Sequence, residues 1–183
     1  LTTRQRGHAA LNLRETSCYS DPFGLFLTGT PGCDPVQSTI PARRVSFTVW
    51  TSVMAVAEGN YGRLDPNQQQ RFTTANRRLQ LPDPDEQPGA MPEFAPSPDY
   101  GRSIDLPLHE RAMVLQAWGA YGTVWSVVHQ QLGVRPDLGN YRVEVTPQVP
   151  PGSPGIAGDN IRLGDGSLSV RAQASRGMYI TAV

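Results

Sequence analysis

Residues 88–132 read PGAMPEFAPSPDYGRSIDLPLHERAMVLQAWGAYGTVWSVVHQQL and join a proline-rich loop to the strongest helical pattern in the chain. Over residues 114–132 apolar side chains recur at steps of three and four, so they form two neighbouring stripes along one helix. Small residues in the same span would let other helices approach closely: Ala117, Gly119, Ala120 and Gly122. The stretch therefore predicts an inner helix of a multi-helix assembly.

Two further helices are predicted upstream of this one. Residues 44–60 are apolar nearly all round; their β-branched residues make a strand the competing prediction, but their length and Ala-rich second half favour a helix. Residues 65–80 are polar, begin with Asp65 as a cap, and carry a thin apolar stripe of Phe72, Ala75 and Leu79. A deeply apolar helix followed by a polar one is typical of the inner and outer pair of an α/α toroid.

The two ends of the chain have a different character. Residues 1–42 are rich in breakers and are expected to be mostly irregular, with a short strand or turn at 24–28. Residues 141–183 alternate in polarity between Gly-containing turns at 164–166 and 175–177, which predicts a small antiparallel β tail. The sequence thus predicts an α+β protein with a helical part at residues 1–140 and a β segment at residues 141–183.

Composition limits the classes of partner. The 183 residues include 16 Lys and Arg and 16 Asp and Glu, so no basic surplus favours nucleic acid, and no apolar run is long enough to span a bilayer. The chain begins without Met and without a signal-peptide pattern, so we expect a processed chain or a fragment. Two helices that are apolar nearly all round lead us to expect another polypeptide that supplies further helices.

Cys18 and Cys33 bracket a loop rich in Gly, Pro and Thr. Their spacing, with no nearby histidine or further cysteine to complete a metal site, favours a disulfide over two reduced thiols. A disulfide is typical of an oxidising compartment, so the predicted location is secreted or extracytoplasmic.

The order of these segments resembles the C-terminal part of the six-hairpin (α/α)6 glycosidases, the glucoamylase and glucodextranase group. The resemblance covers residues 43–132, where two helices, a Pro-Glu loop and a last helix rich in Ala, Gly and Trp follow one another. In that group a glutamate in the loop before the last inner helix is the general base of an inverting hydrolysis, and Glu93 takes that place. The family's motif is Pro/Ala-Glu-Gln, whereas this chain reads Pro92-Glu93-Phe94.

The resemblance also implies that the general acid lies on an earlier hairpin that this chain does not contain. Inverting enzymes hold their acid and their ionised base about 6.5 to 9.5 Å apart, with room for the attacking water. Asp99 and Asp105 are the reserve carboxylates of the same loop. The alternative is that Glu93 is a solvated loop carboxylate with no catalytic role.

Aromatic residues near Glu93 are the candidates for sugar binding. Tyr100 and Trp118 could stack on sugar rings, and Trp118 matches a Trp that the family carries on its last inner helix. Trp125 could stack in the same way, but the helical spacing of Trp118 and Trp125 favours a position in the protein core for both. His109 and His129 lie too far apart along the chain to share a metal, so neither a metal nor a cofactor is predicted.

The function predicted from these features is the C-terminal chain or fragment of an inverting glycoside hydrolase acting on a carbohydrate. The alternative is a noncatalytic carbohydrate-binding or structural module on the same scaffold.

Overall fold

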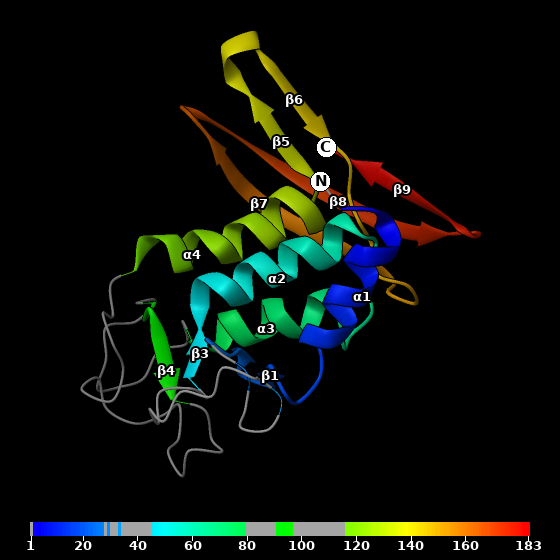
Figure 1. Ribbon diagram of the computed structural model, residues 1–183. Coiled ribbons are helices and arrows are strands. Elements are labelled where there is room, and N and C mark those ends of the chain that lie inside the picture. The colour runs from blue at the N-terminus through cyan, green and yellow to red at the C-terminus, as the bar shows by residue number, and fades with distance from the viewer. Residues whose placement is uncertain (1, 28, 30–32, 34–44, 80–90, 97–115) are drawn as a thin grey trace. The chain divides into compact units, whose positions relative to one another are not determined.

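The computed structural model describes residues 2–27, 29, 33, 45–79, 91–96 and 116–183 (Figure 1). Its described parts combine helices with small antiparallel sheets, so the predicted α+β class is confirmed at this level. The chain divides into two compact units, Leu1–Thr123 and Val124–Val183. The division predicted from the sequence, 1–140 and 141–183, lies after the last helix, whereas the compact units meet within it.

Residues 45–60 form both of the structures that their sequence favoured. The start is strand β3 (Val45–Phe47), which pairs antiparallel with β4 (Phe94–Pro96), and the helix α2 occupies Thr48–Asn60. The prediction of a helix from residue 44 is therefore wrong at its beginning, because the β-branched end of the segment has a strand partner. The Ala-rich half is helical as predicted, and Met54, Ala55 and Val56 are buried in it.

Helix α3 (Gln69–Leu79) runs antiparallel to α2. Gln69 Nε2 donates to the carbonyl of Ala55 at 3.2 Å, and Asn76 Nδ2 donates to Ser52 Oγ, so rising positions on α3 meet falling positions on α2. The predicted apolar stripe is confirmed at Phe72 and Ala75, which are both fully buried. The residues from Asp65 to Gln68 form a turn before the helix rather than its first turn.

Helix α4 (Ala117–Val124) runs parallel to α2. A Cβ on Gly119 would lie 2.5 Å from Thr48 Oγ1, and one on Gly122 would overlap Ser52 Oγ and Cβ. Gly119 and Gly122 on α4 therefore lie against Thr48 and Ser52 on α2, in the same order, so the two helices run in the same direction. The three helices follow one another as a helix, its antiparallel neighbour, and a second helix parallel to the first, as Figure 1 shows.

The first residues of the chain differ from the prediction of irregular structure. They form helix α1 (Arg4–Arg14), whose start is capped by Thr3 Oγ1 accepting from the Arg6 amide at 3.4 Å. The helix was missed because it is mostly polar and buries only Gly7 and Leu11. Strands β1 (Ser20–Asp21) and β2 (Gly24–Leu25) follow, and β2 lies where a short strand was predicted.

The second unit begins with the end of the long helix. After Val124 the backbone continues as a π-helix, η4 (Trp125–Gln131), and Gly133 follows with φ at +70°, in the left-handed region that glycine favours. The helical prediction for residues 114–132 is confirmed from residue 117 to residue 131, and residues 114–115 lie outside the described part. Nothing in the residue pattern separated its α-helical half from its π-helical half.

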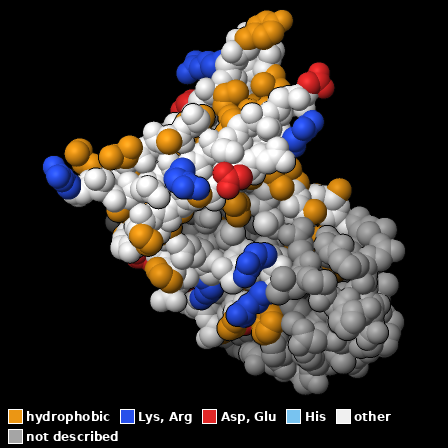
Figure 2. All heavy atoms as spheres, turned by 180° about the vertical axis from the view of Figure 1, so that it is seen from behind, with side chains coloured by type: hydrophobic (Ala, Val, Ile, Leu, Met, Phe, Trp, Pro, Cys, Tyr) orange, Lys and Arg blue, Asp and Glu red, His pale blue; other side chains and the backbone are white. Residues whose placement is uncertain are grey.

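The remainder of this unit contains strands, as predicted for its tail. β5 (Val134–Asp137) and β6 (Arg142–Val145) form one hairpin across the short 3-10 turn Leu138–Asn140, and β5 was not predicted. β7 (Gly155–Leu163), β8 (Gly166–Ser175) and β9 (Met178–Ala182) form a sheet with the two predicted turns. Leu132, Val134 and Val170 form its small core. Hydrophobic side chains lie at the tip of the β5–β6 hairpin in Figure 2, where Tyr141 is 99% exposed.

Candidate functional site

Glu93 is fixed through its backbone to the start of α2. Its carbonyl oxygen accepts from the Thr48 amide at 3.0 Å and from Thr48 Oγ1 at 3.1 Å. Thr48 Oγ1 also donates to the carbonyl of Pro92 at 2.9 Å, and Thr48, Met91 and Pro92 are all buried. The Glu93 side chain is half-buried on this rigid support.

The same segment also meets the start of α4. The Gln116 amide donates to the carbonyl of Met91 at 2.9 Å, and a Cβ on Gly119 would come within 2.8 Å of Met91 Cγ. Residues 91–93 therefore join the N-terminal ends of two parallel helices. Backbone carbonyls of this segment accept from the amides of Thr48 and Gln116 at these two ends.

Of the predicted sugar-binding residues, one lies in the described structure. Trp118 stands in the first turn of α4 and is 52% exposed, so it is not a core residue. Trp125 is 38% exposed, so it too lies outside the core. Glu93 and Trp118 thus belong to the same end of the α2–α4 pair. Tyr100, with the reserve carboxylates Asp99 and Asp105, lies outside the described residues.

Cys18 and Cys33 form a disulfide, with an S–S distance of 2.04 Å and Cα atoms 5.6 Å apart. The predicted pairing is confirmed. Tyr19 supports the same loop, because its hydroxyl donates to the carbonyl of Cys33 at 3.2 Å.

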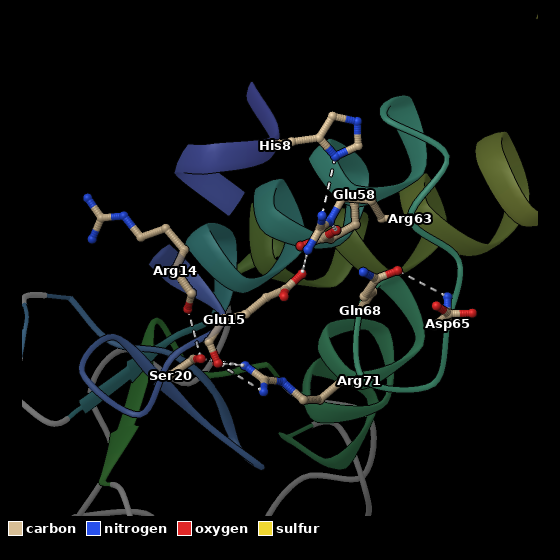
Figure 3. A network of polar contacts seen from close by, with 9 residues as sticks. All are labelled: His8, Arg14, Glu15, Ser20, Glu58, Arg63, Asp65, Gln68 and Arg71. Atoms are coloured by element: carbon tan, nitrogen blue, oxygen red, sulfur yellow. Dashed lines mark hydrogen bonds and ion pairs between the residues drawn. The ribbon is translucent and has the colours of Figure 1, made fainter. Parts of the chain in front are cut away.

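A largely buried network of titratable side chains was not predicted from the sequence (Figure 3). Arg63 Nε lies 2.6 Å from Glu58 Oε2, its Nη2 contacts Glu15 Oε1, and its Nη1 lies 3.3 Å from His8 Nδ1. The Glu58 side chain is fully buried, and this burial, with the hydrogen bond and repulsion from Glu15, raises the pKa of Glu58 to about 8 against the opposing effect of Arg63. One signal was available in the sequence, because Glu58 is the one charged residue of α2.

The described residues contain no cluster of three or more His, Cys, Asp or Glu side chains arranged to hold a metal ion. Among the helices that the structure describes, none is long and apolar enough to cross a membrane.

Comparison of the chain with protein-family models, with curated proteins and with solved structures found no match. Function therefore has to be inferred from the geometry of the site.

Proposed function

We propose that this chain is the C-terminal part of an inverting glycoside hydrolase built on an (α/α)6 toroid, with Glu93 as its general base. The observation that carries the proposal is the position of residues 91–93, which join the N-terminal ends of the parallel helices α2 and α4. In the proposal α2 and α4 are neighbouring inner helices of the toroid and α3 is the outer helix between them. The resemblance noted from the sequence places the general base on the loop before the last inner helix, where Glu93 lies.

The surroundings of Glu93 suit the task of a base. A general base must reach the attacking water, and the half-buried Glu93 side chain keeps part of its surface in contact with solvent. Two hydrogen bonds from Thr48 hold the Glu93 carbonyl, so the side chain extends from a fixed backbone position. The general acid, which must protonate the leaving sugar oxygen, belongs in this proposal to another part of the protein or to a partner polypeptide.

Sugar binding is assigned in the proposal to Trp118 and Tyr100. An exposed indole near the base offers a flat apolar surface on which the apolar face of a sugar ring can stack. The proposed location is secreted or extracytoplasmic, which the Cys18–Cys33 disulfide supports.

Replacement of Glu93 tests the role of the base. Glu93→Gln in the complete protein keeps the shape of the side chain and removes its ability to take a proton, so sugar release should fall at least about a hundredfold. Substrate binding should be largely retained. The measurement is the rate of hydrolysis of a glycoside, together with sugar binding by calorimetry.

Glu144→Gln is the matched control, because this exposed carboxylate on β6 is replaced by the same amide and should leave turnover unchanged. If the Glu93 variant works at nearly the parent rate while Asp99→Asn or Asp105→Asn is inactive, the assignment of Glu93 is wrong.

The exposure of Trp118 also supports the second candidate, a noncatalytic carbohydrate-binding module. In that case Trp118→Ala should weaken sugar binding, and Glu93→Gln should change nothing because no reaction occurs.

A further inference from the structure

The first unit contains a cavity of about 660 Å³ that does not involve Glu93, Thr48 or Trp118. It is lined on one side by the disulfide-bonded segment and on the other by the start and outer face of α3. The described lining residues are Glu15, Ser17, Cys18, Ser20, Asp21, Pro22, Phe26, Cys33, Pro66, Gln70, Arg71, Thr74 and Arg78. Cavities of this size are typical of small-molecule sites.

Two arginines form the α3 side of the cavity. Arg71, Thr74 and Arg78 are spaced at three and four residues, which places them on one face of the helix. Arg71 is half-buried, and its Nη1 and Nη2 donate to the carbonyl of Glu15 at 3.3 and 3.2 Å. Nη2 also donates to Ser20 Oγ, and the buried Nε has no hydrogen-bond partner among the described residues.

The guanidinium of Arg71 therefore contacts neutral oxygens, and no described carboxylate forms an ion pair with it. Burial lowers the pKa of Arg71, while the negative charges of Glu15, Asp21 and Glu58 act in the opposite direction. A partly desolvated cation without a direct counter-ion is costly, so an anion in the cavity would offset part of this cost.

The acids of the lining do not cancel this positive charge. The Glu15 carboxylate pairs with Arg63, whereas Arg71 contacts Glu15 only at its backbone carbonyl, as Figure 3 shows. Asp21 is also engaged within the protein, where its Oδ1 accepts from the Phe23 amide at 2.7 Å. Among the described lining residues no carboxylate forms an ion pair with Arg71 or Arg78, which favours an anionic ligand.

The other polar groups of the lining suit hydroxyl groups. Ser17, Gln70 and Thr74 offer hydrogen-bond donors and acceptors to such groups. Phe26, with Pro22 and Pro66, adds an apolar surface.

We propose that this cavity binds a small hydroxylated anion, a sugar phosphate or a sugar acid, whose oxyanion lies at Arg71 and Arg78 and whose hydroxyl groups reach Ser17, Gln70 and Thr74. This site is separate from the glycosidase proposal and does not depend on it. The two kinds of ligand share one chemistry, an oxyanion on a polyhydroxylated body.

Calorimetric titration of the full chain tests the proposal with glucose 6-phosphate, glucuronate and the neutral sugar glucose as probes. At least one of the two anionic sugars should bind, and the one that binds identifies the oxyanion. Its affinity should fall at least about tenfold in Arg78→Gln, because a charge-assisted hydrogen bond is lost. Arg77→Gln is the matched control: both residues are exposed basic side chains in the last turn of α3, but only Arg78 is among the described lining residues.

Three results would overturn the proposal: neither anionic sugar binds, glucose binds as tightly as they do, or the Arg77 and Arg78 variants lose affinity equally. Titration of the unmodified chain at rising salt gives a readout that needs no variant, because attraction to the two arginines should weaken as salt screens it. Glu93→Gln should bind the anionic sugar as the parent does, so failure of the glycosidase proposal leaves this result unaffected.

Discussion

Glu58 is an acid in the interior of a helix pair, and its protonation is coupled to folding. Burial and Glu15 raise its pKa from 4.5 to about 8, so the folded state holds a proton that the unfolded state releases at lower pH. The stabilising contribution of Glu58 is complete below about pH 4.5 and is lost as the pH rises through about 8.

We therefore expect the free energy of unfolding to fall between about pH 5 and pH 8, on the order of 3 kcal/mol from Glu58 alone. Glu58→Gln should flatten this dependence, because glutamine resembles the protonated acid and does not titrate. Denaturant unfolding at several pH values measures the effect. Glu144→Gln, an exposed carboxylate, should keep the slope of the parent, and equal slopes in the parent and the Glu58 variant would contradict the assignment.

The site residues that the sequence predicted correctly are those whose partners lie close to them in the chain. Cys18 and Cys33 lie on one short loop, so their pairing was readable from spacing. The network around Arg63 joins α1, α2 and the turn before α3, and no local pattern connects Glu15 with Glu58. The spacing of Trp118 favoured a core position, which is wrong: the side chain is 52% exposed, because helical spacing alone does not show which face of α4 is covered.

At the scale of elements, α2 and α4 meet through glycines. Adding a methyl group at Gly122 would drive it into Ser52, which itself donates to the Thr48 carbonyl at 2.9 Å and accepts from Asn76. The close approach therefore requires a residue without Cβ. It also explains why a helix of modest length contains two glycines despite their poor helix propensity.

A Cβ at Gly122 would overlap Ser52 Oγ, so overpacking in Gly122→Ala should cost about 3 kcal/mol. Alanine regains roughly 1 kcal/mol of helix propensity, so the free energy of unfolding should fall by about 2 kcal/mol. Thermal or denaturant unfolding measures the loss. Gly139→Ala is the control, since a Cβ there would meet nothing within 4 Å and stability should stay near that of the parent. A Gly122 variant as stable as the parent would show that the two helices are not packed this closely.

The elements predicted from the sequence are those in which buried residues recur at a regular spacing within the element itself. The α2 and α3 stripes and the β tail follow periods of 3.6 and 2 and were predicted. Helix α1 was missed because it packs through a glycine and a histidine and not through an apolar stripe. A Cβ on Gly7 would overlap the ring of Tyr61, and the His8 ring meets the same ring edge-on, with the centroids 5.4 Å apart. Strand β5 was missed because its extended structure depends on pairing with β6, which the residues of β5 alone do not show.

At the scale of the whole molecule, each of the two parallel helices leaves large apolar side chains in contact with solvent. Trp50 and Val53 on α2 and Trp118 on α4 are each about half exposed. Large contiguous apolar areas mark interaction surfaces, and we expect these side chains to contribute to one. The (α/α)6 proposal assigns this surface to the remaining helices of the toroid, whether from the same polypeptide or from a partner.

The chain purified by itself should therefore associate, and sedimentation velocity should show faster species as its concentration rises. The double variant Trp50→Ser with Val53→Ser should sediment closer to a monomer, because it removes apolar area without adding charge. Tyr141→Ser is the control, since this fully exposed ring lies on the β5–β6 hairpin instead. A compact monomer at every concentration would contradict the expected association.

The anchoring of residues 91–93 has a consequence for how such a protein can diverge in evolution. The carbonyls of Met91, Pro92 and Glu93 are bound by Thr48, the first residue of α2, and by Gln116, which directly precedes α4. All of these contacts use the backbone of residues 91–93 and not the Glu93 side chain. A substitution at position 93 can therefore change the chemical group presented there while the same hydrogen bonds hold the backbone, so selection can test new side chains at an unchanged position.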